Sequence, residues 1–142
     1  MSRGLLSPRD ARTYGASGVI PSDQFLLYCF DHGDGAAPSA AQVADAVLAR
    51  APSITDLGLR IAPAPGDLEH PAWARGEVPA VREGVACTWD AVPAAVARLF
   101  ARQVDATVAP WRLHVFPRVD GAPRCVGPAT VVVLQVAHAL AD

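Results

Sequence analysis

The sequence predicts an α+β domain in which helices flank a mixed β-sheet. Short apolar runs rich in β-branched or aromatic residues have the character of strands, and they alternate with two stretches of helical periodicity. Of the 142 residues, 51% are apolar and 18% are charged, which is enough apolar material for a buried core and argues against a disordered chain. No stretch has the composition of a linker, so we expect one domain over residues 1–142.

The first half of the chain contains three recognisable elements. A short helix is expected to begin at Ser7, which would cap it, with Pro8 in the first helical position. Residues 24–30 (QFLLYCF) predict a strand that a turn-rich DHGDG segment closes. Residues 39–50 predict an amphipathic helix with Ser39 as its N-cap.

The middle of the chain gives weaker signals. Residues 56–61 predict a short strand, and residues 62–80, with four prolines, predict an irregular connection anchored by Trp73. Residues 81–88 predict another strand.

The last third predicts a helix followed by two strands. Asp90 is expected to cap a helix that runs to about Val104. Residues 111–116 (WRLHVF) alternate as in a strand, and a final apolar strand begins near Thr130. The expected order is therefore β-α-β-β-α-β-β.

Composition excludes several classes of function. The net charge is −2, which argues against a general nucleic-acid binder. All twelve basic residues are arginine, so the chain supplies no P-loop lysine and no Schiff-base lysine. The three cysteines, Cys29, Cys87 and Cys125, form no CxxC pair, which argues against a zinc site or a disulfide framework and favours a reducing compartment.

The sequence also lacks the signals of membrane insertion. The N-terminus has no apolar signal-peptide core, and no stretch reaches the roughly eighteen apolar residues of a membrane span. We expect a cytoplasmic protein, at most in peripheral contact with a membrane or a lipid droplet.

The end of the chain carries the most chemical information. The apolar run that starts at Thr130 delivers His138 to its end, and Asp142 follows four residues later. An unperturbed histidine has a pKa of about 6.5, which suits it to act as a general base near neutral pH. From the spacing alone, a core or interface histidine with a satisfied hydrogen bond is the simpler interpretation of His138.

The other histidines have simpler interpretations. His114 is expected to be a half-exposed residue of the sheet. His32 lies between aspartates in a segment typical of a turn, so we expect no metal there. His70 has no partner at a suggestive spacing.

Several segments resemble one family when they are taken in order. Residues 137–142 (AHALAD) resemble the HHxxxDG motif of the condensation-type acyltransferase superfamily, and within it the wax ester synthase/diacylglycerol acyltransferase family is the most similar. Other family segments have counterparts here: the LSPxD opening, the LRxR-type segment, a tryptophan after it, and the LDRxRPLWxL segment resemble residues 6–10, 57–60, Trp73 and residues 104–113.

The resemblance implies a fold, a reaction and a division of roles. The chain would be the N-terminal lobe of the chloramphenicol acetyltransferase-like two-lobe fold, ending inside the motif, with a C-terminal lobe still to be supplied. The donor would be acyl-CoA, used as a co-substrate without a bound cofactor, and the acceptor an alcohol or diacylglycerol, as in lipid biosynthesis. His138 matches the catalytic second histidine, and Asp142 would pair with an arginine and fix the loop that aims it.

The chain departs from the pattern at two positions. Ala137 replaces the first histidine of the motif, and Ala106 replaces the arginine of the LDR segment, where Asp105 keeps the aspartate. Two other functions therefore stay open: a non-catalytic module that binds an acyl ligand or a partner protein, and a condensation-type enzyme that uses a carrier-protein thioester. We also expect the isolated chain to associate through the sheet surface beside its last strand.

Overall fold

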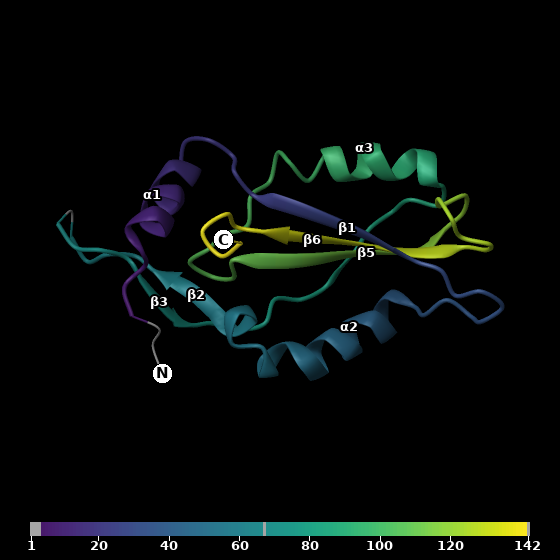
Figure 1. The fold of residues 1–142 in the computed structure, drawn as a ribbon, viewed down its shortest axis with the longest axis horizontal. Helices are drawn as coiled ribbons and strands as arrows, with labels where there is room; N and C mark the ends of the chain where they lie inside the picture. Colours follow the sequence, from purple (N-terminus) through teal and green to yellow (C-terminus); the bar gives the residue numbers. More distant parts are fainter. Residues whose placement is uncertain (1–3, 67, 142) are drawn as a thin grey trace.

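A four-stranded mixed sheet forms the centre of the molecule (Figure 1). The computed structural model describes residues 4–66 and 68–141. The strand order is β1 (Gln24–Phe30), β6 (Ala129–Val136), β5 (Trp111–Val119) and β4 (Arg82–Glu83). β6 is antiparallel to both of its neighbours, whereas β4 is parallel to β5. The predicted mixed sheet is confirmed.

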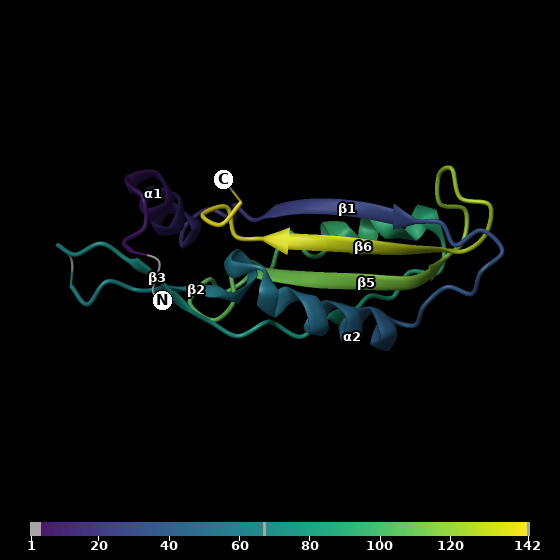
Figure 2. The same ribbon diagram turned by 60° about the horizontal axis from the view of Figure 1, so that its bottom comes forward.

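Helices cover the two faces of this sheet. α2 (Ala40–Arg50) lies on one face and α3 (Val92–Ala97) on the other, as the turned view in Figure 2 shows. On the α2 face, Trp111 and Val136 pack with the end of α2. On the α3 face, Val131 and Val133 pack with Val92. This double coverage explains why β6 reads as a continuous apolar run and not as an alternating one.

A second, smaller structure gathers at the end of the sheet where β6 stops (Figure 1). It consists of α1 (Pro8–Ser17) and a two-stranded antiparallel ribbon of β2 (Leu59–Ala62) and β3 (Ala72–Arg75). Leu6 joins this group because its amide donates to the carbonyl of Pro71 over 2.9 Å. Elements from both halves of the chain thus meet beside the end of β6.

The two early helices begin where the sequence predicts. The Ser7 hydroxyl accepts from the amide of Asp10 over 3.1 Å, and Pro8 occupies the first turn of α1. Ser39 and Gln42 form a reciprocal capping box at the start of α2, in which the side chain of each residue accepts from the backbone amide of the other.

The predicted irregular connection over residues 62–80 is only partly correct. It contains β3, in which Trp73 stands opposite Ile61 of β2 and is 8% exposed. Pairing with β2 and burial of the indole supply the order that the local sequence, with its prolines, does not indicate. The expected strand at residues 56–61 is displaced, because residues 55–58 form a 3₁₀ turn ahead of β2.

The predicted strand over residues 81–88 is mostly wrong, since only Arg82 and Glu83 are in strand conformation. The next residue, Gly84, still donates its amide to the carbonyl of Val115 over 2.7 Å. A Cβ atom at Gly84 would overlap the ring of Phe116, so glycine is required for this close approach of the backbone to β5.

The predicted helix over residues 90–104 is also shorter than expected. A 3₁₀ turn, Trp89–Ala91, precedes α3, which ends at Ala97, and Asp90 lies inside the turn without capping the helix. The residues after α3 continue in turns, where Phe100 meets Phe25 edge to face with ring centroids 4.5 Å apart. The segment after α3 thus packs against the edge strand β1 through Phe100 and does not continue as a helix.

The exposed edge of the sheet belongs to β1 and not to the final strand. β6 is paired on both sides, with Leu134 opposite both Leu26 and Leu113. On β1, Leu26, Tyr28 and Phe30 are between 44% and 50% exposed. The expected association through this region of the sheet stays a prediction. Within the described residues, no helix has the length and apolar character needed to cross a bilayer.

Shortening a side chain in the middle of β6 tests the central position of this strand. Val133 is fully buried, so Val133→Ala should lower the free energy of unfolding in urea by about 2 kcal/mol through lost burial and a residual cavity. Val126→Ala removes the same atoms from a residue that is 90% exposed and should change stability by less than about 0.5 kcal/mol. Equal losses in the two variants would contradict the double coverage of β6.

Candidate active site

His138 lies directly after β6, in a short turn that backbone hydrogen bonds hold in place. The amide of Ala137 donates to the carbonyl of Pro110 over 2.7 Å, which extends the pairing with the chain ahead of β5 by one residue. The amide of Leu140 then donates to the carbonyl of Ala137, and the amide of Ala141 donates to that of His138, over 2.9 and 3.1 Å. His138 is therefore the first residue of a tight turn and is partly buried.

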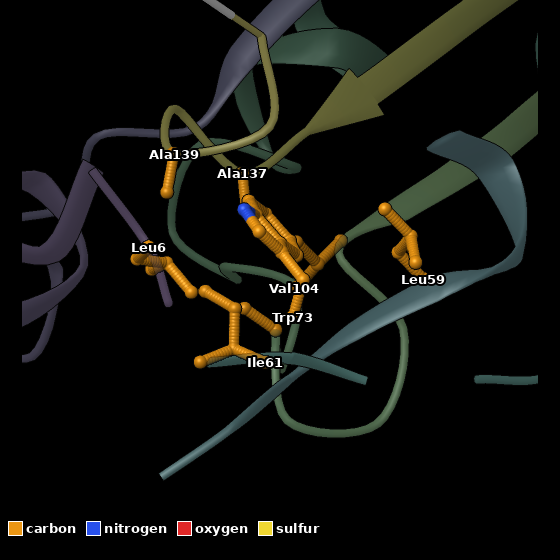
Figure 3. Close-up of a cluster of buried hydrophobic side chains, with 8 residues drawn as sticks. Leu6, Leu59, Ile61, Trp73, Val104, Ala137 and Ala139 are labelled. Atoms are coloured by element: carbon orange, nitrogen blue, oxygen red, sulfur yellow. The ribbon is translucent and has the colours of Figure 1, made fainter. Parts of the chain in front are cut away.

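An apolar cluster holds this turn in place. Ala137 and Ala139 are buried and pack with Leu6, Ile61 and Trp73 (Figure 3). Ala137 thus contributes a methyl group to a packed cluster and brings no polar group to the site. The residues on both sides of His138 are fixed by packing, which restricts where the imidazole lies.

A cavity of about 190 Å³ lies beside the turn. Its walls come from the end of α1, the two residues just before β1, residues 103–107 and the turn itself, and His138 is one of the lining residues. The predicted base is therefore at the surface of a cavity and not packed away in the core. Apart from Asp105, which the sequence already indicates, the polar lining residues carry no signal in the sequence, because their segments are brought together only by the fold.

Asp105 shapes one wall of this cavity. Its Oδ1 accepts from the backbone amide and the hydroxyl of Thr107, over 2.9 and 2.6 Å, while its carbonyl accepts from the amides of Val108 and Ala109. This is the local turn chemistry expected of an aspartate. The carbonyl of Ala106 also accepts from the amide of Ile61 over 2.8 Å, which ties the turn to β2.

A buried polar network connects the other wall to the sheet. Gln135 of β6 is 1% exposed, and its Nε2 donates to Oδ2 of Asp23 over 2.7 Å and to the carbonyl of Arg102 over 2.6 Å. The same Asp23 oxygen accepts from the amide of Val104 over 2.8 Å. The segments at 22–23 and 102–104 are therefore held against each other and against β6.

His114 completes this network and corrects the prediction that it is half-exposed. It is 7% exposed, and its Nε2 lies 2.9 Å from Oε1 of Gln135. Because both Nε2 protons of Gln135 are used, Oε1 is the acceptor and His114 Nε2 is the donor. Burial lowers the pKa of His114, the charges of Arg112 and Arg82 lower it further, and the hydrogen bond to Gln135 opposes them.

The remaining predicted residues lie away from the cavity or outside the described residues. Nε2 of His32 lies 2.8 Å from the hydroxyl of Thr130 at the opposite end of β6. Asp142, the expected partner of the histidine loop, is outside the described residues. Among the residues that the structure describes, no three His, Cys, Asp or Glu side chains are grouped so that they could hold a metal ion.

Comparison with solved structures finds a similar fold in a known enzyme. The wax ester synthase/diacylglycerol acyltransferase from Marinobacter aquaeolei VT8 superposes with a TM-score of 0.72 at 18% identity. The match covers 98% of this chain and 34% of the other, so the chain spans about a third of that enzyme's length. No family model matches the sequence, and no curated protein matches it either.

The superposition shows a relationship at the level of the fold. The chain has the architecture of one lobe of the chloramphenicol acetyltransferase-like fold found in that enzyme, as the sequence predicts. An identity of 18% does not carry the activity across.

The pH dependence of stability tests the buried state of His114. Its pKa is lowered from an unfolded value of about 6.5, so the folded chain binds fewer protons than the unfolded chain as the pH falls. The contribution of His114 is thus present above about pH 6.5 and is lost as the pH falls through its lower folded pKa. The variant His114→Gln keeps an amide donor for Gln135 without titrating, so its urea stability should fall less between about pH 7 and 5. Identical pH slopes in parent and variant would contradict the assignment.

Proposed function

We propose that this chain is one lobe of an acyl-CoA-dependent O-acyltransferase in which His138 is the general base. The observation that carries the proposal is the position of His138: it lines a cavity at the end of the buried β6, in a chain with an acyltransferase-like fold. The ordered resemblance of residues 6–10, 57–60, 104–113 and 137–142 to the wax ester synthase/diacylglycerol acyltransferase family supports the same conclusion.

The reaction needs a general base beside the acceptor hydroxyl and hydrogen-bond donors for the oxyanion that forms. His138 removes the proton from the acceptor hydroxyl while the oxygen attacks the carbonyl carbon of the thioester. The carbon–oxygen bond forms, a tetrahedral oxyanion collapses, and the carbon–sulfur bond breaks. The imidazolium returns its proton to the departing thiolate, which leaves as CoA thiol, so His138 ends the cycle neutral.

The loss of the first motif histidine is compatible with this role. Position 137 packs in the cluster around Trp73 and brings only a methyl group to the cavity lining, whereas position 138 brings a histidine. In the proposed enzyme Asp142 fixes the loop from the other side by pairing with an arginine, as the family resemblance implies. The contacts to the donor's thioester and to the oxyanion would come from the remaining two thirds of a protein with the size of the Marinobacter enzyme.

Thiol release from a long-chain acyl-CoA in the presence of an alcohol tests the proposal. The full-length protein should release CoA thiol, and His138→Ala should lower that rate by a factor of about 10² to 10⁴, the usual contribution of a general base. His70→Ala, at an exposed position remote from the cavity lining, should keep the parent rate.

Two outcomes would contradict the proposal in different ways. Equal rates for the parent and His138→Ala would remove His138 from the chemistry. No release from the intact full-length protein with any acyl-CoA would favour the alternative of a non-catalytic binding module.

A further inference from the structure

Two of the three cysteines lie on adjoining segments at the end of the sheet remote from His138. Cys29 is in β1, and Cys125 is in the loop that connects β5 to β6. The two segments are joined by a hydrogen bond, because the amide of Val126 donates to Oδ2 of Asp31 over 3.3 Å. The residue after Cys125 is therefore bonded to the residue two positions after Cys29, although the two cysteines lie far apart in the sequence.

The two thiols are also close enough to influence each other. Both side chains are partly buried, and Cys29 packs against the apolar cluster on the α3 face, opposite Val131 of β6. Burial raises the pKa of the Cys29 thiol, and the charge of Cys125 raises it further. Because the interaction of two charges weakens with distance, this effect identifies the two thiols as neighbours.

The loop that carries Cys125 can change its backbone at small cost. Arg124, directly before it, has a φ of 63°, in the left-handed region where a residue with a side chain is strained. The amide of Cys125 donates to the carbonyl of Ala122 over 3.2 Å, and its Sγ makes a weak contact with the carbonyl of Pro123 over 3.6 Å. A disulfide needs a specific geometry at both cysteines. β1 is paired with β6 along its whole length, so the loop supplies the adjustment.

Cys87 differs from this pair in its exposure and in its backbone contacts. Its side chain is exposed, whereas those of Cys29 and Cys125 are partly buried. Its carbonyl accepts from the amide of Asp120 over 2.9 Å, and the next residue, Thr88, pairs with Asp120 in an isolated bridge. Cys87 is thus a thiol that reagents reach freely on a backbone that is held in place, which makes it an internal control for the pair.

We propose that Cys29 and Cys125 form a reversible disulfide when a low-molecular-weight disulfide, such as glutathione disulfide, oxidises the chain. One protein thiolate attacks a sulfur of the oxidant, which gives a mixed disulfide and releases one thiol. The other protein thiolate then attacks the protein sulfur of the mixed disulfide and releases the second thiol. The two cysteines lose two electrons and two protons, and the oxidant takes them up as two thiols.

The bond joins the β5–β6 loop to the edge strand β1. It lies at the end of the sheet opposite the cavity, so it does not rest on the proposed reaction. In a reducing compartment both thiols stay free, and the disulfide forms when the ratio of oxidised to reduced glutathione rises. A bond between residues so far apart in the sequence restricts the unfolded chain, so the oxidised form is the more stable one.

Thiol counting and mass spectrometry after treatment with glutathione disulfide test the proposal on the chain itself. The number of free thiols should fall from three to at most one, and digestion without reductant should release the peptides that contain Cys29 and Cys125 as a linked pair. The melting temperature should rise by roughly 5 to 15 °C, and dithiothreitol should return it to the starting value.

Single substitutions separate this pair from general thiol oxidation. Cys29→Ala and Cys125→Ala should each abolish the linked peptides and the rise in melting temperature, and the remaining thiol of the pair should carry glutathione instead. Cys87→Ala is the matched control and should keep both the linked peptides and the rise. Cys125→Ala changes only a loop residue, so it still decides the question if Cys29→Ala lowers the stability of the reduced chain.

Three results would overturn the proposal. The first is a disulfide from Cys125 to Cys87, or disulfide-linked dimers, in place of the internal bond. The second is glutathione attached to Cys29 or Cys125 in the parent chain without a bond between them, because the second thiol would then not reach the first. The third is a linked form that melts no higher than the reduced chain, because the bond would then distort the loop and the strand that it joins.

Discussion

The burial of β6 is the constraint on which the rest of the structure depends. This strand is paired along both edges and covered on both faces, so a shift of its register would disrupt the pairing with both neighbours and the packing on both faces at once. The one polar side chain buried near its end, that of Gln135, must then find its hydrogen bonds inside the protein. It finds them on Asp23, on the carbonyl of Arg102 and on His114, and these contacts position two walls of the cavity.

Packing and polar contacts therefore act together at the end of the strand. The methyl groups of Ala137 and Ala139 join the cluster around Trp73, and these two residues line the cavity together with His138. The partly buried His138 is thus held between two packed side chains. The same end of the sheet collects α1, the residues just before β1 and the turn at Asp105, and these segments together enclose the cavity.

The sequence predicts the elements whose signals are local. Residues 24–30, Ser39 with its helix, and the strand before His138 are all where the pattern places them, because capping and β-branched runs act over a few residues. β3 was missed because it is four residues long with two alanines, and it is ordered by pairing with β2. The buried state of His114 was missed because it alternates with Arg112, although a glutamine inside an apolar strand is itself a sign that a buried partner exists.

The candidate site also contains both residues that the sequence predicts and contacts that it does not. His138 is predicted from its place at the end of a strand. The hydrogen bonds of Ser22 with Gln103 and of Asp23 with Val104 have no signal in the sequence, because they join segments 81 residues apart that meet only in the fold.

The most direct test of the proposed role of His138 is a crystal structure of the full-length protein with an acyl-CoA analogue and an alcohol acceptor. If His138 is the general base, an acceptor oxygen will lie within about 2.6 to 3.2 Å of one of its imidazole nitrogens. An acceptor bound elsewhere, with the imidazole turned away from the reacting carbonyl, would contradict it.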